Sequence, residues 1–254
     1  FQAPSHQLAR HFFGYKEIFA DLPGKYSNHI TVGNDDIKDV YLKFGINPDK
    51  VSVVGSLEFD IMSSEVKVLE SKDLQSNSPE VIFFTQPFNK YSWGKEFWIQ
   101  EVKSFVDDCE KSGVSYAFAL HPRDDASFYK KYVDPNYILA NDISFEEKVS
   151  LIRSSKLAVV KSSTITNTIL ALRKPIAYIN YASFFPQVNM IDIFKKEMII
   201  YKNNNIADIL QYVSENSKDV INHQEDTSLQ VFPEMGNAKN NIQNIIRNSS
   251  YKRT

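Results

Sequence analysis

Three segments of the chain place polar side chains directly after short apolar runs. These side chains belong to Thr85 and Gln86, to His121 and Arg123, and to Lys161, Ser162, Ser163 and Thr164. Hydroxyl, ammonium, guanidinium and imidazole groups all bind phosphate oxygens, either by hydrogen bonding or by charge. The three segments therefore predict an anion site, provided that the fold brings them together.

The segment 157–168, LAVVKSSTITNT, carries the strongest of these signals. Its four apolar residues are typical of a strand that is buried on both faces of a parallel sheet. Residues 166–172 predict a helix, so the polar cluster lies at the turn from strand to helix. Backbone N–H groups and the positive end of the helix dipole favour an anion there. The alternative is that Ser163 or Thr164 simply caps the helix.

His121 precedes a proline, which fixes φ and prevents a further ladder hydrogen bond. Its imidazole could donate to a phosphate or protonate a leaving oxygen, and Arg123 could pair bidentately with the same anion. The alternative is an ordinary turn histidine, with Arg123 paired to Asp124 or Asp125. We interpret the two aspartates as such partners or as helix caps, not as metal ligands. Gln86 has a structural alternative as well.

Strands and helices are expected to alternate along the chain. The predicted strands are residues 29–32, 51–54, 81–84, 116–120, 137–140, 157–160, 176–179 and 198–201. The predicted helices are residues 35–44, 94–111, 144–155, 166–172, 206–213 and 238–246. This alternation predicts an α/β protein with a Rossmann-like, doubly wound parallel sheet. The strand ends then meet at one edge, where ligands of such sheets usually bind.

A serine-rich segment, residues 61–79, divides the chain as a predicted linker. Residues 1–60 are interpreted as the remnant of an N-terminal α/β domain. Residues 80–222 are expected to form a Rossmann-like domain, and residues 223–254 a tail with a helix. Because the chain does not start with Met, we also expect it to be a fragment.

Composition excludes several classes of function. A net charge of −2 gives no electrostatic basis for binding nucleic acid. The single cysteine, Cys109, rules out an intramolecular disulfide and a multi-cysteine metal site, and it fits a cytoplasmic protein. No apolar run approaches the ~20 residues that span a bilayer. No metal site is expected.

Three passages resemble known enzyme families. VGNDDIKDVYLKFGINPDKVSVVGSLEFD is similar to the last β-α-β unit of the first domain in GT-B sugar-nucleotide enzymes. FALHPRDD is similar to the His-Pro motif of bacterial GT-B sialyltransferases, which make lipooligosaccharide and polysialic acid. KSSTITNTILALRKPIAYIN resembles their Ser-Ser/Thr motif. Capsule Kdo-transferases and teichoic-acid glycerophosphotransferases share similar features. UDP-GlcNAc 2-epimerases share the VVGS passage but lack the HPRDD sequence.

The resemblance implies that residues 80–222 are a GT-B type C-terminal domain that binds a nucleotide sugar, with part of a second α/β domain ahead of it. It implies that His121 and the hydroxyls of residues 162–164 hold the phosphate and ribose side of CMP. One departure concerns the acidic pair followed by Gly that supplies the general base in those sialyltransferases. Here Asp35 and Asp36 are followed by Ile37. The base and the acceptor pocket are therefore expected outside this chain, unless the enzyme differs.

The main hypothesis is a metal-independent glycosyltransferase with no cofactor. It would transfer a sugar such as sialic acid from a CMP-linked donor to a surface glycan acceptor. His121 would be the catalytic residue, and Gln86, Arg123, Lys161, Ser162, Ser163 and Thr164 would bind the nucleotide and its phosphate. The alternatives are a UDP-sugar epimerase or hydrolase of the UDP-GlcNAc 2-epimerase type, and a non-catalytic GT-B-like domain. A cytoplasmic location is expected. Peripheral association with the inner face of the membrane and homo-oligomer formation are left open.

Overall fold

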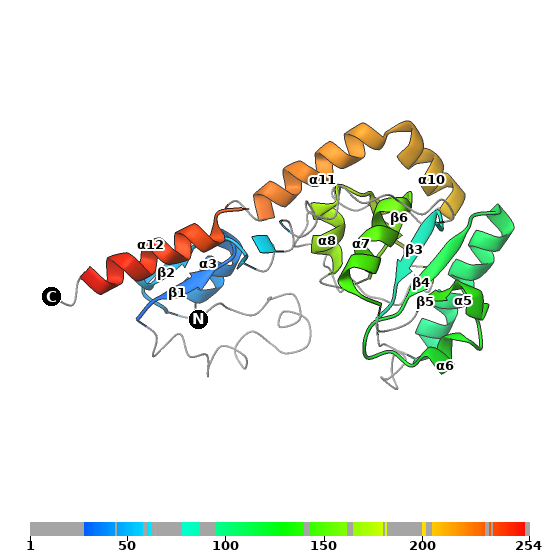
Figure 1. The fold of residues 1–254 in the computed structure, drawn as a ribbon, viewed down its shortest axis with the longest axis horizontal. Helices are drawn as coiled ribbons and strands as arrows, with labels where there is room; N and C mark the ends of the chain where they lie inside the picture. The colour runs from blue at the N-terminus through cyan, green and yellow to red at the C-terminus, as the bar shows by residue number, and fades with distance from the viewer. Residues whose placement is uncertain are drawn as a thin grey trace. The chain divides into compact units, whose positions relative to one another are not determined.

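The structure is a computed structural model. It describes residues 28–43, 45–57, 60–61, 64, 78–86, 95–139, 143–161, 165–179, 181, 200–201, 205–231, 234 and 236–251. The chain divides into two compact units, which are Phe1–Ser64 with Ser228–Thr254, and Glu65–Thr227. Figure 1 shows the elements of both units.

The first unit contains a parallel β-α-β motif. Strand β1 (Ile30–Val32) leads into helix α3 (Asp35–Lys43), and the 3-10 helix η2 (Pro48–Lys50) leads into strand β2 (Val51–Val53). The two strands pair in parallel with Ile30 opposite Val51. Gly45 ends the helix at a φ of 80°, a left-handed conformation that favours glycine. The predicted β-α-β unit and its glycine cap are confirmed.

The C-terminal segment belongs to this same unit. Helix α12 (Ala238–Tyr251) begins where the carboxylate of Asp60 accepts backbone N–H groups from Gly236 at 2.6 Å and Ala238 at 2.8 Å. A negative charge at the N-terminal end of a helix also interacts favourably with the helix dipole. Gly55 lies so close to Glu234 that an added Cβ would come within 2.8 Å of its carbonyl oxygen. The structure groups the residues from Ser228 onward with the first unit, whereas the predicted tail starts at residue 223.

The second unit is built on a six-stranded, fully parallel sheet with the order β5-β4-β3-β6-β7-β8. Its strands are β3 (Val81–Phe84), β4 (Tyr116–Ala119), β5 (Ile138–Leu139), β6 (Leu157–Val159), β7 (Ile176–Tyr178) and β8 (Ile200–Tyr201). The chain starts at β3, runs outward to β5, then returns to β6 and runs the other way to β8. This reversal defines a doubly wound sheet, so the predicted fold class is confirmed.

Helices alternate with these strands, and α10 and α11 follow the last of them. The helices are α5 (Lys95–Ser112), α6 (Ala126–Tyr129), α7 (Phe145–Ser154), α8 (Ile165–Ala171), α10 (Ile206–Glu215) and α11 (Ser217–Val231), with the 3-10 helix η4 (Pro135–Tyr137) before β5. Helix α7 begins with the predicted capping box, in which Ser144 and Glu147 exchange backbone and side-chain hydrogen bonds.

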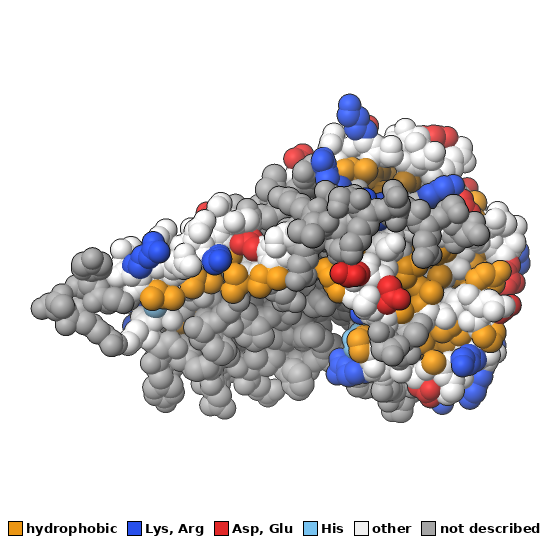
Figure 2. Space-filling model, viewed as in Figure 1, with side chains coloured by type: hydrophobic (Ala, Val, Ile, Leu, Met, Phe, Trp, Pro, Cys, Tyr) orange, Lys and Arg blue, Asp and Glu red, His pale blue; other side chains and the backbone are white. Residues whose placement is uncertain are grey.

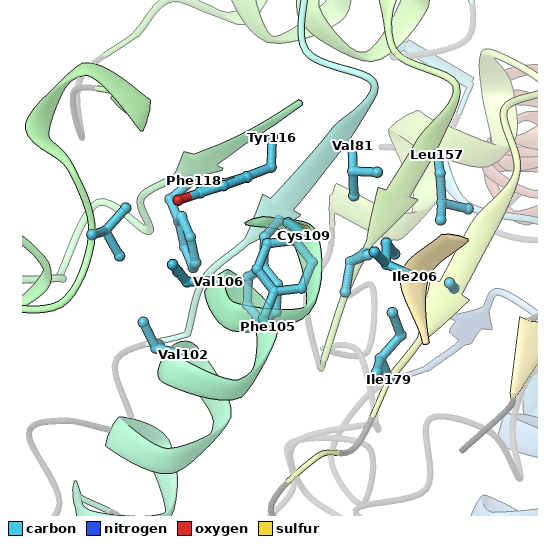
Figure 3. Close-up of a cluster of buried hydrophobic side chains, with 14 of the residues drawn as sticks. Val81, Val102, Phe105, Val106, Cys109, Tyr116, Phe118, Leu157, Ile179 and Ile206 are labelled. Carbon is cyan, nitrogen blue, oxygen red and sulfur yellow. The ribbon is translucent and has the colours of Figure 1, made fainter. Parts of the chain in front are cut away.

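The main core lies between the sheet and helix α5 (Figure 3). The apolar face of α5 presents Phe105 against Phe83 of β3, with ring centroids 4.8 Å apart in an edge-to-face arrangement. Phe118 of β4 lies 5.5 Å from the same Phe105 ring. Such pairs contribute about 0.5–1.5 kcal/mol each beyond the burial of apolar area. This packing fixes β3 and β4 relative to one another. It therefore also fixes the relative positions of the polar residues that directly follow the two strands.

Helix α11 is joined to the sheet by Gln224. Its side-chain oxygen accepts the backbone N–H of Ile176 at 2.9 Å, and its amide nitrogen donates to the carbonyl of Lys174 at 2.8 Å. The glutamine thus satisfies the backbone at the start of β7, as a neighbouring strand would. The buried amide needs these partners, because an unpaired polar group costs about 1–3 kcal/mol in such a position.

Figure 2 shows acidic and basic groups interspersed on the face that it displays. Among the described residues, no helix combines the length and apolar character that crossing a bilayer requires.

Candidate phosphate-binding site at the edge of the sheet

The predicted site residues follow three adjacent strands of the second unit. In the parallel pairing, Phe84 of β3 lies opposite Ala119 of β4, and Phe83 lies opposite Val159 of β6. The carboxyl ends of all three strands therefore meet at one edge. Strands β4 and β6 are both neighbours of β3, so their backbones are about 10 Å apart. That distance is within the reach of one nucleotide.

This edge also contains the point where the winding of the sheet reverses. The reversal falls between β3 and β6, which are neighbours in space but separated along the chain by β4 and β5. In open α/β sheets, the crevice outside the strand ends at such a point is the usual place for ligands. Thr85 and Gln86 follow one of its two strands, and Lys161 follows the other.

His121 is held in a defined tautomer by its own turn. Its Nδ1 accepts the backbone N–H of Arg123 at 3.0 Å, so the ring proton of the neutral imidazole belongs on Nε2. The backbone N–H of Asp124 closes the turn on the carbonyl of His121 at 2.8 Å. The imidazole is partly exposed and Arg123 is exposed. A hydrogen-bond donor and a cation therefore share one short turn at the edge of the sheet.

A buried network lies directly behind this turn. The backbone N–H of His121 donates to the hydroxyl oxygen of Thr85 at 2.8 Å, and the Thr85 hydroxyl donates to Oδ2 of Asp124. The hydroxyl of Tyr129 donates to the same Oδ2 at 3.2 Å. Trp98 completes the chain by donating its indole N–H to the Tyr129 oxygen at 2.8 Å.

Burial raises the pKa of the Asp124 carboxyl, while the hydrogen bonds from Thr85 and Tyr129 oppose that rise. Burial also raises the pKa of Tyr129 well above its ordinary value, so the phenol remains a proton donor. The next residue behaves differently, because Asp125 is exposed and caps helix α6 through the backbone N–H of Ser127 at 2.9 Å. The predicted helix-cap role is thus confirmed for Asp125 and does not apply to Asp124.

Lys161 does not offer its ammonium group to the surface. The residue is 2% exposed, and its Nζ pairs with the buried carboxylate of Glu101 and donates to the carbonyl of Ile179. Its Nζ also lies 4.9 Å from the centre of the Tyr178 ring. Burial lowers the pKa of Lys161, and the charge of Glu101 opposes that shift. This position corrects the predicted phosphate contact, since the lysine instead joins the end of β6 to helix α5 and β7.

The remaining predicted residues give less information. Ser162, Ser163 and Thr164 lie outside the described residues, so their phosphate-binding and capping roles stay predictions. Gln86 is partly buried and directly follows Thr85 at the end of β3. Within the described part of the chain, no group of three or more histidine, cysteine or acidic side chains could hold a metal ion.

Sequence reasoning overlooked four residues that organise this edge, which are Thr85 as a bridging hydroxyl, Trp98, Glu101 and Tyr129. One usable signal was present for Glu101. It stands on the apolar side of helix α5, between Trp98 and Phe105, where an acidic residue requires a buried partner. Tyr129 gave no signal, because its contact with Asp124 follows from the turn geometry alone.

Similar proteins are found by comparison of structures and not by comparison of sequences. No protein-family model matches the chain, and no curated protein matches its sequence. Solved structures with a similar fold include S. aureus MnaA in complex with UDP, with a TM-score of 0.63 and 14% identity over 92% of this chain and 63% of that chain.

Two further solved structures are similar at comparable levels. UDP-GlcNAc 2-epimerase from Neisseria meningitidis bound to UDP-GlcNAc has a TM-score of 0.57 and 16% identity, covering 88% of this chain and 62% of that chain. The H548A form of the wall teichoic acid polymerase TagF has a TM-score of 0.58 and 12% identity, covering 94% and 62%. The chain therefore spans less than two thirds of the length of these proteins. At these identities the likeness shows the fold, which is of the GT-B-like α/β type.

Proposed function

We propose that this chain binds the phosphate groups of a nucleotide-activated sugar at the shared edge of β3, β4 and β6. We further propose that it belongs to an enzyme acting on a UDP-sugar, of the UDP-GlcNAc 2-epimerase type. The observation that carries the proposal is the position of His121. Its neutral imidazole is oriented by its own turn, one strand away from the reversal of the sheet.

The residues of this edge have distinct proposed roles. His121 donates its Nε2 proton to a phosphate oxygen and stabilises the charge that grows there when the bond to the sugar breaks. Arg123, exposed on the same turn, pairs with the anion. Gln86 and the hydroxyls of Ser162, Ser163 and Thr164 contact the nucleotide and its phosphates from β3 and β6. Lys161 is kept out of this contact set.

The comparisons favour UDP over CMP as the nucleotide. Two of the similar solved structures contain UDP or UDP-GlcNAc. The UDP-sugar alternative therefore replaces the CMP-sialic acid hypothesis as our main proposal. With this substrate class we propose a cytoplasmic location, where nucleotide sugars are available as substrates.

A transferase is the second candidate. The sequence HPRDD resembles the His-Pro motif of the transferases rather than a feature of 2-epimerases. The similarity to the teichoic acid polymerase TagF is also of the same order as that to the epimerases. A structure of TagF soaked with CDPG is also similar, with a TM-score of 0.51 at 11% identity. In this case the donor is CDP- or CMP-linked, the second substrate is a glycan or polyol phosphate acceptor, and the enzyme works at the membrane face.

Calorimetric titration with UDP, CDP and CMP separates these candidates. We expect UDP to bind most tightly, and a concentration of ~100 times its Kd to stabilise the fold by about 2.7 kcal/mol in a thermal shift assay. Incubation with UDP-GlcNAc, followed by proton NMR, is then expected to show an epimeric or hydrolysed sugar.

Uridine and inorganic phosphate serve as control ligands in the same titrations. Preference for CDP or CMP over UDP would favour the transferase instead. Absence of saturable binding by all three nucleotides would contradict both enzyme proposals and point to the non-catalytic alternative.

A further inference from the structure

A partly exposed histidine at the end of a strand needs its turn to be held still if it is to serve a phosphate. One contact that orients the ring of His121, from the backbone N–H of Arg123 to Nδ1, is made within the turn itself. Any looseness of the turn would let the ring exchange tautomers and move. The question is therefore which groups hold the turn from behind.

Thr85 and Asp124 provide that support from two directions. The hydroxyl of Thr85, at the end of β3, accepts the backbone N–H of His121 at 2.8 Å and donates to Oδ2 of Asp124. The same Oδ2 lies 3.3 Å from the backbone nitrogen of His121. The backbone N–H of His121 thus faces two oxygens, of Thr85 and Asp124, that are hydrogen-bonded to each other.

The support is anchored deep in the core. Tyr129 of α6 donates to Asp124 at 3.2 Å and accepts the indole N–H of Trp98 at 2.8 Å. Thr85 and Asp124 are 2% and 8% exposed, and Tyr129 and Trp98 are fully buried. The turn is therefore connected through side chains to α5, α6 and β3, whose relative positions the aromatic core fixes.

We propose that Thr85 and Asp124 are positioning residues of the phosphate site, which hold the His121 turn so that the imidazole presents Nε2–H to the ligand. This inference rests on the proposed function of His121 and extends it to residues that never touch the ligand. Thr85 is central to the arrangement, because its hydroxyl forms hydrogen bonds with both the His121 backbone and the Asp124 carboxylate.

Two substitutions of Thr85 give a matched test. Thr85→Val keeps the shape of the side chain and removes the hydroxyl, whereas Thr85→Ser keeps the hydroxyl. Nitrogen-15 labelled histidine reports the ring tautomer by NMR, and the His121 signal is assigned by its loss in His121→Ala. We expect a single Nε2–H tautomer in the wild type and in Thr85→Ser, and a mixture of tautomers in Thr85→Val.

Nucleotide affinity is the second readout. Loss of one buried hydrogen bond in the support predicts about tenfold weaker UDP binding for Thr85→Val, and wild-type binding for Thr85→Ser. Thr31→Val, the same change in strand β1 of the other unit, is the control and should alter neither readout. Tyr129→Phe is expected to shift both readouts in the same direction as Thr85→Val, by a smaller amount.

The two readouts separate failure of this inference from failure of the proposed function. If the wild-type protein binds none of UDP, CDP and CMP, the proposed function fails, while the tautomer comparison still decides whether the turn is held. A wild-type tautomer in Thr85→Val overturns the inference. Disorder of the ring with unchanged UDP affinity also overturns it, since the turn would then be held for no purpose at this site.

Discussion

Replacing His121 with alanine is expected to lower turnover of the nucleotide sugar by about 100-fold to 1000-fold, since a preorganised donor to the developing anion is lost. The fold should survive, because the imidazole is partly exposed and its Nδ1 contact with Arg123 lies within its own turn. The measurement is kcat/KM for the substrate identified in the nucleotide titrations, together with the thermal unfolding midpoint.

His223→Ala is the matched control for that experiment. His223 is exposed on α11 and has no place in the proposed site, so its replacement should leave turnover unchanged. His121→Gln keeps a side-chain N–H donor and should recover part of the activity. Turnover by His121→Ala equal to that of the wild type would contradict the assignment of this residue.

Replacing Glu101 with alanine is expected to destabilise the second unit by about 3–5 kcal/mol, since Lys161 would keep a buried charge without its carboxylate partner. Glu101 is fully buried on α5, and Lys161 is 2% exposed at the end of β6. The free energy of unfolding from urea titration gives the measurement. Asp107→Ala, an exposed change on the same helix, should alter it by less than ~0.5 kcal/mol.

Two further results would test the same ion pair. Replacing both partners, with Glu101→Leu and Lys161→Met, should restore most of the lost stability, because an apolar pair leaves no buried charge.

Burial lowers the pKa of Lys161 in the folded state, so the unfolded state binds more protons between that pKa and the ordinary lysine value of 10.5. Stability of Glu101→Ala should therefore rise with pH through that interval. A pH-independent deficit would show that lost packing, not charge, causes the effect.

The strands, and the polar residues that follow them, could be predicted from the sequence. Apolar runs such as Val81–Phe84 and Leu157–Val159 become central strands of the sheet, as expected for segments buried on both faces. The capping box at Ser144 follows from local spacing alone, and the structure contains it. These features depend on short-range chemistry that a single sequence displays directly.

The roles of charged residues at the site were harder to predict. Asp124 and Asp125 are chemically identical neighbours, yet one is buried behind the His121 turn and the other caps α6. Lys161 was expected at the surface, because it follows an apolar strand and precedes three hydroxyl residues. Its partner Glu101 lies 60 residues earlier on α5, a contact that only the packing of helix on sheet determines.

The most direct test of the phosphate site is a titration of the wild-type protein with UDP, followed by backbone amide and histidine ring signals in NMR. Our account predicts saturable shifts at His121, Arg123, Thr85 and Gln86, and at Ser162 to Thr164, while signals from β1 and β2 stay in place. Saturable binding whose shifts leave the His121 ring and residues 162–164 unchanged would contradict it.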